Sequence, residues 1–96
     1  MDEDSVLKKA RYLVLRLLTY RARSTKEVSD YLNRKGFTEE IVKGIIGEMT
    51  AYGYLNDHKF AKDFIAYCKI RGNGMKKVRY ELALKGLDRN IVDDLV

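Results

Sequence analysis

The sequence predicts an all-α protein: two tandem three-helix repeats, about six helices in all, in an elongated and curved arrangement. Apolar residues recur at the 3.6-residue spacing of helices, and no alternating run favours a strand. The chain also repeats itself, because residues 23–42 align without a gap on residues 73–92, an offset of 50 positions. No proline is present to break a helix. Repetition at such an offset is typical of tandem helical units.

The first predicted helix runs from about Asp4 to Arg21, with apolar residues along one face. The second begins at Ser24, and Glu27 three positions later completes a capping box, in which each side chain accepts the other residue's backbone N–H. Gly36 favours a left-handed turn that ends this helix.

The third predicted helix is capped by Thr38, and Phe37 and Val42 have the spacing of a hydrophobic staple. Gly53 ends the helix. The residues expected to face inward are Ile41, Ile45, Ile46 and Met49.

The stretch GYLNDHKFA, residues 53–61, joins the two repeats. Asn56 is expected to cap the fourth helix, and Asp57 to favour its first turn. Leu55 and Phe60 are expected to form a staple. His58 is expected at the surface, so this run of polar residues predicts a connection between repeats rather than a catalytic site.

The fifth predicted helix follows Gly74 and ends at Gly86. The sixth is capped by Asp88, with Leu87 and Val92 as its staple. We therefore predict one repeat over residues 1–54 and a second over residues 55–96, whose third helix is truncated. This truncation leads us to expect a fragment of a longer protein with about two of its tandem repeats.

Basic residues are concentrated in two stretches of a chain whose net charge is +5. Residues 5–26 hold seven basic residues and no acid, and residues 69–79 hold five and no acid. Such clusters indicate an anionic partner, either a nucleic acid or an acidic protein surface, although a solvated basic face is the alternative. Arg21 and Lys26 of the first repeat correspond to Arg71 and Lys76 of the second. The candidate binding residues are Arg21, Arg23, Lys26, Lys69, Arg71, Lys76, Lys77 and Arg79.

The residues that carry most enzyme chemistry are scarce. His58 and Cys68 are single, and Cys68 occupies a position expected in the core. No set of ligands has the spacing of a zinc site, and RGNG at 71–74 lacks the pattern of a phosphate loop. We expect no enzyme activity, no metal and no cofactor.

The seven tyrosines divide into two groups. Tyr31 and Tyr52 are expected in the core, whereas Tyr20 and Tyr67 lie near basic side chains and are suited to stacking. One cysteine and no long apolar run predict a cytoplasmic protein with no membrane segment, and we expect a monomer.

Four motifs together resemble the RecX regulatory proteins: L-x-x-R-x-R-S at 18–24, RKGF at 34–37, GYLND…FA at 53–61, and R-G-x-G…K-G at 71–86. The resemblance covers about residues 10–87. It implies tandem three-helix repeats and a protein that binds the RecA recombinase filament, a partner in recombination, DNA repair and the SOS response. It further implies inhibition of ATP hydrolysis, strand exchange and repressor cleavage, and, for some members, binding to single- or double-stranded DNA.

The alternative function is a DNA-binding module of the helix-turn-helix type without RecA specificity. The segment STKEVSDYL, followed by a turn and TEEIVKGII, has the outline of that motif. However, Glu39 and Glu40 open the helix that would read the bases, and their charge would repel phosphate.

Overall fold

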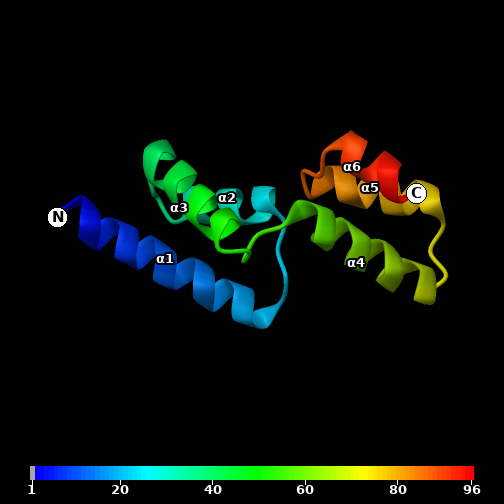
Figure 1. The fold of residues 1–96 in the computed structure, drawn as a ribbon, viewed down its shortest axis with the longest axis horizontal. Coiled ribbons are helices and arrows are strands. Elements are labelled where there is room, and N and C mark those ends of the chain that lie inside the picture. The colour runs from blue at the N-terminus through cyan, green and yellow to red at the C-terminus, as the bar shows by residue number, and fades with distance from the viewer. Residues whose placement is uncertain (1) are drawn as a thin grey trace.

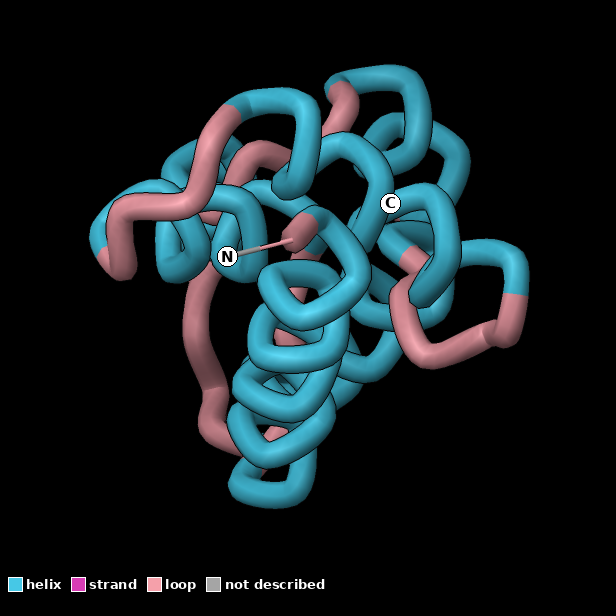
Figure 2. Tube along the Cα trace, turned by 90° about the vertical axis from the view of Figure 1, so that its left-hand side faces the viewer, coloured by secondary structure: helices cyan, strands magenta, loops and turns pink. Residues whose placement is uncertain are grey.

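Six α-helices, with no strand, make up residues 2–96, which the computed structural model describes. They are α1 (Glu3–Tyr20), α2 (Thr25–Arg34), α3 (Glu39–Ala51), α4 (Asp57–Ile70), α5 (Met75–Leu84) and α6 (Arg89–Leu95) (Figure 1). Short loops join consecutive helices (Figure 2). The prediction of an all-α protein with tandem three-helix units is confirmed.

Each set of three helices encloses its own hydrophobic core. Helices α1 to α3 surround the first cluster of buried residues, which includes Val14, Leu32 and Ile45, and α4 to α6 surround the second, which includes Ile65 and Leu82. The molecule is elongated, with extents of 49 × 23 × 23 Å. The two units follow one another along its long axis (Figure 1).

Local capping signals account for where most helices begin. The Ser24 Oγ accepts the Glu27 N–H at 3.1 Å, and the Glu27 carboxylate accepts the Ser24 N–H at 3.0 Å, so the predicted capping box is present. Thr38, Asn56 and Asp88 cap α3, α4 and α6 through their side chains, as the sequence predicts. Helix α6 has seven residues, whereas its counterpart α3 has 13.

Two expectations for the end of the first unit were wrong. Tyr52 was expected in the core, but 74% of it is exposed, because it follows α3 beyond Met49, the last buried residue of that helix. Leu55 and Phe60 were expected to form a staple, but they belong to different clusters. The Leu55 N–H donates to the Met49 carbonyl at 3.2 Å, which folds Leu55 back onto the first core.

Polar contacts at the start of α2 join the two units, and we call this region the junction. The Ser24 hydroxyl, fully buried, donates to the Lys85 carbonyl at 2.7 Å. The Thr25 N–H donates to the Asp57 carboxylate at 2.8 Å. Asp57 was expected to serve the first turn of its own helix, but in the structure it also caps α2 of the neighbouring unit.

The turn between α5 and α6 approaches the same region closely. Gly86 has a φ of +79°, and a Cβ built on it would clash with the Lys26 Cβ. A side chain at position 86 would therefore collide with Lys26. The absence of a side chain lets the two units meet this closely.

Candidate functional site

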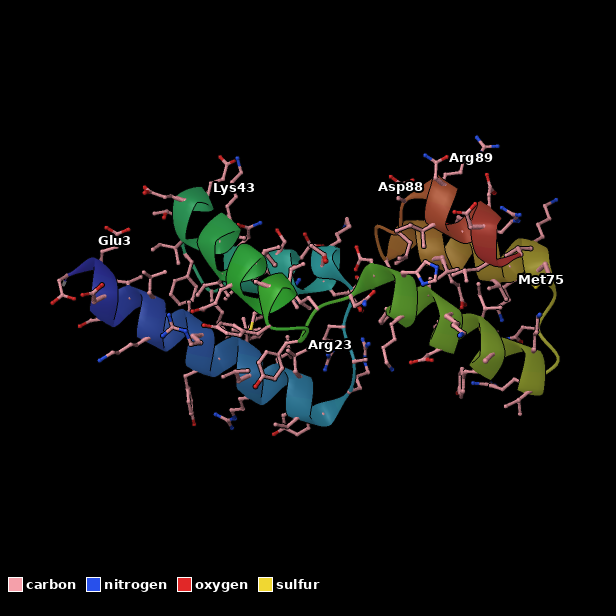
Figure 3. All side chains as sticks on the ribbon, in the orientation of Figure 1. Glu3, Arg23, Lys43, Met75, Asp88 and Arg89 are labelled. Carbon is pink, nitrogen blue, oxygen red and sulfur yellow. The ribbon has the colours of Figure 1, made fainter. Side chains whose placement is uncertain are left out.

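The candidate basic residues occupy the equivalent connections of the two units. Arg21, Arg23 and Lys26 lie around the α1–α2 connection, and we call them the junction cluster. Lys69, Arg71, Lys76 and Lys77 lie around the α4–α5 connection, and we call them the distal cluster. Figure 3 shows Arg23 midway along the molecule and Met75, which begins α5, at the far end from α1.

The charges of the junction cluster are largely neutralised within the molecule. The Arg21 Nη2 lies 2.9 Å from the Glu27 carboxylate, and the Lys26 Nζ lies 2.8 Å from that of Asp30. Arg23 is half-buried, and its Nε is buried without a hydrogen-bond partner in residues 2–96. Burial, with the nearby charge of Arg21, lowers the pKa of Arg23 from its ordinary value, although Glu27 opposes the shift.

Glu27 connects the two units electrostatically. Its burial alone would raise the pKa of its carboxyl, but hydrogen bonds from Arg21 and from the Ser24 N–H, with the charge of Lys85, outweigh burial. The pKa is therefore lowered from its ordinary value of 4.5. The Lys85 Nζ lies 3.7 Å from the carboxylate, so one acid holds a cation from each unit.

Replacing Glu27 with glutamine is expected to destabilise the protein by less than about 1 kcal/mol near neutral pH, because these pairs are partly exposed. Glutamine keeps the capping-box hydrogen bond and removes only the charge. The pKa of Glu27 is lower in the folded protein than its ordinary value of 4.5. The ionised carboxylate therefore contributes fully to stability above pH 4.5, and this contribution is lost as the pH falls through the folded-state pKa.

Urea unfolding near neutral pH and at about pH 3 measures this difference in stability between wild type and variant, which is expected to be smaller at the lower pH. Glu39→Gln is the control, because its carboxylate is 82% exposed and pairs only within α3. A difference that persisted undiminished at acid pH would contradict a charge-based role for Glu27.

The distal cluster, by contrast, has no ion pairs within the described residues. None of Lys69, Arg71, Lys76 and Lys77 takes part in an ion pair within residues 2–96, and all four are exposed. The Arg71 guanidinium donates to the Tyr67 hydroxyl at 2.9 Å and lies 5.6 Å from the ring centre, and the hydrogen bond raises the Arg71 pKa. The predicted partnership of Tyr67 with a basic side chain is therefore present.

The start of α5 is electrostatically unfavourable by itself. Lys76 and Lys77 lie in its first turn, where the helix dipole disfavours cations. Gly74 offers no side-chain cap, and the first turn holds no acid. The corresponding turn of α2 has both Ser24 and Glu27. An anionic partner would relieve this unfavourable arrangement.

Arg79 differs from the rest of the candidate set. Its Nη1 lies 2.7 Å from the Asp93 carboxylate, which also lies 3.9 Å from Arg89. Asp93 and Arg79 are 14 positions apart, so the pair links α5 to α6. Its geometry favours a structural contribution within the second unit.

The described residues contain no cluster suited to metal binding. No group of three or more His, Cys, Asp or Glu side chains lies together within residues 2–96. His58 is exposed, and Cys68 is buried in the second core, as predicted. None of the helices in this part of the chain is long and apolar enough to cross a membrane.

Comparison with known protein families finds two matches that follow the two units. The model described as RecX, first three-helix domain, matches residues 10–49, and that described as RecX, second three-helix domain, matches residues 56–95.

Individual proteins give a consistent result. Regulatory protein RecX of Bacillus licheniformis is 36% identical over 89 residues, which cover 92% of this chain and 34% of that protein. Regulatory protein RecX of Chlorobium phaeobacteroides is 33% identical over 94 residues, covering 97% of this chain and 62% of that protein. The chain thus spans about a third of the length of the first curated relatives it matches.

A solved structure has the same arrangement of helices. The crystal structure of RecX from Lactobacillus salivarius superposes with a TM-score of 0.85 at 27% identity, over 93% of this chain and 58% of that one. The similarity therefore extends across both units and their relative placement.

Proposed function

Since the chain belongs to the RecX family of regulatory proteins, we propose that it binds the RecA recombinase filament and inhibits its ATPase, strand-exchange and SOS co-protease activities. The observation that supports this proposal most directly is the distal cluster, whose four cations have no ion-pair partner within residues 2–96. These exposed cations are available to an anionic surface.

The proposed mechanism requires no catalysis by this protein. An elongated array of helices would contact neighbouring recombinase subunits at once, and with them the DNA phosphates where these are exposed. Such contacts would hold the filament in one state or obstruct the addition of subunits. The protein would then act as a binding regulator in the cytoplasm, and its single cysteine, buried as a free thiol, fits a reducing environment.

The two-unit division supports a bivalent mode of contact. We propose residues 1–54 and 55–96 as the functional units, with one basic cluster on each. Arg21 and Lys26 of the junction cluster are neutralised by acids of their own unit, whereas no residue of the distal cluster is in an ion pair within the described chain. We therefore assign the main charged contact to the second unit, where Lys69, Arg71, Lys76 and Lys77 gather.

A helix-turn-helix function without RecA specificity has less support. Helix α3, which would be the reading helix, has Glu39 and Glu40 exposed in its first turn. Acids at this end would meet phosphates unfavourably. The exposed acidic turn therefore favours a protein partner over sequence reading by α3.

One titration tests the proposal. The ATPase of RecA on single-stranded DNA is measured as this chain is added, with a gel shift on naked DNA in parallel. We expect inhibition at concentrations well below those that shift free DNA. Tight binding to DNA without any effect on RecA would instead support the helix-turn-helix alternative.

Reversing the charge of Arg71, Lys76 and Lys77 to glutamate is expected to weaken this inhibition about 10- to 100-fold. Three exposed ion pairs contribute about 0.5–1 kcal/mol each, and 1.4 kcal/mol is a factor of ten. Helicity by circular dichroism is expected to be unchanged, because all three side chains are exposed.

The matched control reverses Lys8, Lys9 and Arg16 on α1, which are also exposed. Each reversal changes the charge by −2, so both triple variants go from a net charge of +5 to −1. Equal weakening by both variants would indicate a general charge effect and would overturn the assignment of the distal cluster.

A further inference from the structure

The second helices of the two units carry different exposed faces although they occupy equivalent positions. At the offset of 50, Lys26 of α2 corresponds to Lys76 of α5, and Asp30 corresponds to Tyr80. One turn further, Arg34 corresponds to Leu84. The first unit thus has an alternation of charges where the second has a lysine followed by two apolar side chains.

On α2 the first two charged residues of this face pair with each other. The Lys26 Nζ lies 2.8 Å from the Asp30 carboxylate, four positions along the helix. On α5 the same spacing brings Lys76 toward Tyr80, so Lys76 has no acid at that position. Lys77 has Glu81 four positions along, but neither lysine is in an ion pair within the described chain.

The apolar residues of this face do not belong to the core of their own unit. Tyr80 is 66% exposed and Leu84 is 61% exposed, whereas Val78 and Leu82 on the opposite face are fully buried. Successive positions four apart on a helix are about 6 Å apart along its axis. Lys76, Tyr80 and Leu84 therefore form one line, flanked by Lys77.

We propose that this α5 line (Lys76, Lys77, Tyr80 and Leu84) docks an acidic segment of a partner protein that presents an apolar side chain one to two helical turns beyond its carboxylates. The lysines would pair with the carboxylates, and Tyr80 with Leu84 would receive the apolar side chain. The inference rests on the proposed function, because it identifies the surface through which the second unit contacts the filament.

The composition of the line favours a protein over a nucleic acid. Tyr80 offers one ring on which a base could stack, but Leu84 offers none. It also lines an open depression of about 410 Å³ together with Phe64, Lys85 and the acids Glu27 and Glu81. An apolar side chain can enter such a depression beside Leu84 and Phe64. A basic start with an apolar end matches an acidic segment with an apolar anchor.

The exchange of Tyr80→Asp with Leu84→Arg tests the proposal, because it copies the pattern of α2 onto α5. Asp at position 80 supplies Lys76 with the partner that Lys26 has in Asp30. Both positions are exposed, so the variant is expected to keep its helicity and thermal stability. Its affinity for RecA filaments on single-stranded DNA, measured by co-sedimentation, is expected to fall at least tenfold. Its weaker binding to free DNA is expected to be unchanged.

The reciprocal exchange, Asp30→Tyr with Arg34→Leu, is the matched control and is expected to cause no loss of filament binding. If the α5 variant binds filaments as tightly as the wild type, or if it loses DNA and filament binding together, the proposal is overturned.

A second measurement separates this proposal from the proposed function. A synthetic peptide with two glutamates, followed one helical turn later by phenylalanine and leucine, is titrated into the isotope-labelled protein. Amide shifts along α5, absent with a peptide whose glutamates are replaced by lysines, would support the docking surface even if the wild type bound no RecA. In that case only the proposed partner would be wrong. No shifts along α5 would overturn the docking surface itself.

Discussion

Replacing Leu82 with alanine is expected to destabilise the second unit by about 2–5 kcal/mol, while the first unit stays folded. Leu82 is fully buried in the second cluster, so truncation removes apolar contacts and leaves a cavity. A unit of about 40 residues has roughly 2–6 kcal/mol of total stability at the usual value per residue. The loss is therefore large enough to unfold much of the second unit.

The reactivity of Cys68 with a thiol reagent measures this effect. Its sulfur is in the second cluster, where the residue is 1% exposed, so rapid labelling reports opening of that unit alone. Leu82→Ala is expected to accelerate the labelling of Cys68 by the same factor by which it raises the equilibrium constant for opening of the second unit. About half of the helical circular dichroism signal is expected to remain, because the first unit stays folded.

Leu32→Ala is the matched control, since Leu32 is the counterpart of Leu82 and is fully buried in the first cluster. This variant is expected to lose helix without faster labelling of Cys68. Simultaneous loss of both units in either variant would mean that they fold as one cooperative body, contrary to their separate cores.

Replacing Gly86 with alanine is expected to disturb the junction and to weaken filament inhibition, although position 86 bears no candidate binding side chain. A φ of +79° costs an L-residue about 1–2 kcal/mol. The new Cβ would also clash with the Lys26 Cβ, so α2 and the α5–α6 turn must move apart. That movement would stretch the nearby hydrogen bond from Ser24 to the Lys85 carbonyl.

Gly36→Ala separates the two effects. Gly36 has a φ of +90° and is the counterpart of Gly86, but a Cβ built there would meet no atom within 4 Å. It should therefore cost the backbone strain alone. Thermal unfolding and amide shifts at Thr25 and Asp57 are the measurements. If both alanine variants lost the same stability and left the junction amides unchanged, the close approach at Gly86 would be without consequence.

The features that could be predicted from the sequence are those determined within a few positions. Ser24 and Glu27 are three residues apart, so their capping box depends only on the local helix. The repeat then transfers the same plan to the second unit, although Gly74 offers no side-chain cap at the start of α5. Short-range chemistry is the same wherever the helix lies in the molecule.

The contacts that escaped prediction depend on how the units are placed. Thr25 and Asp57 are 32 positions apart, and Ser24 and Lys85 are 61 apart. No local pattern indicates which helix start lies opposite which turn. Tyr52 fits an apolar stripe in the sequence, yet the helix ends at Ala51, and Tyr52 lies outside the core that Met49 reaches.

In the candidate site, too, local features could be predicted from the sequence, whereas contacts between helices could not. The positions of the basic residues at the two connections follow from the predicted helices, but which charges are neutralised does not. Arg79 reaches Asp93 on another helix, and this pairing requires the fold of the second unit. Tyr80 and Leu84 were also missed, although the repeat carried a signal: they replace Asp30 and Arg34 of the first unit.

The polar character of the junction has a mechanical consequence. Apolar contact is non-directional and allows two bodies to slide or turn, whereas a hydrogen bond requires a particular distance and angle. Ser24 donates to the Lys85 carbonyl and Thr25 donates to the Asp57 carboxylate, so two hydrogen bonds reach two different helices or turns of the second unit. Two directional contacts at different points restrict the rotation of one unit relative to the other. Removal of either one would leave the two units connected but free to turn about the remaining contact.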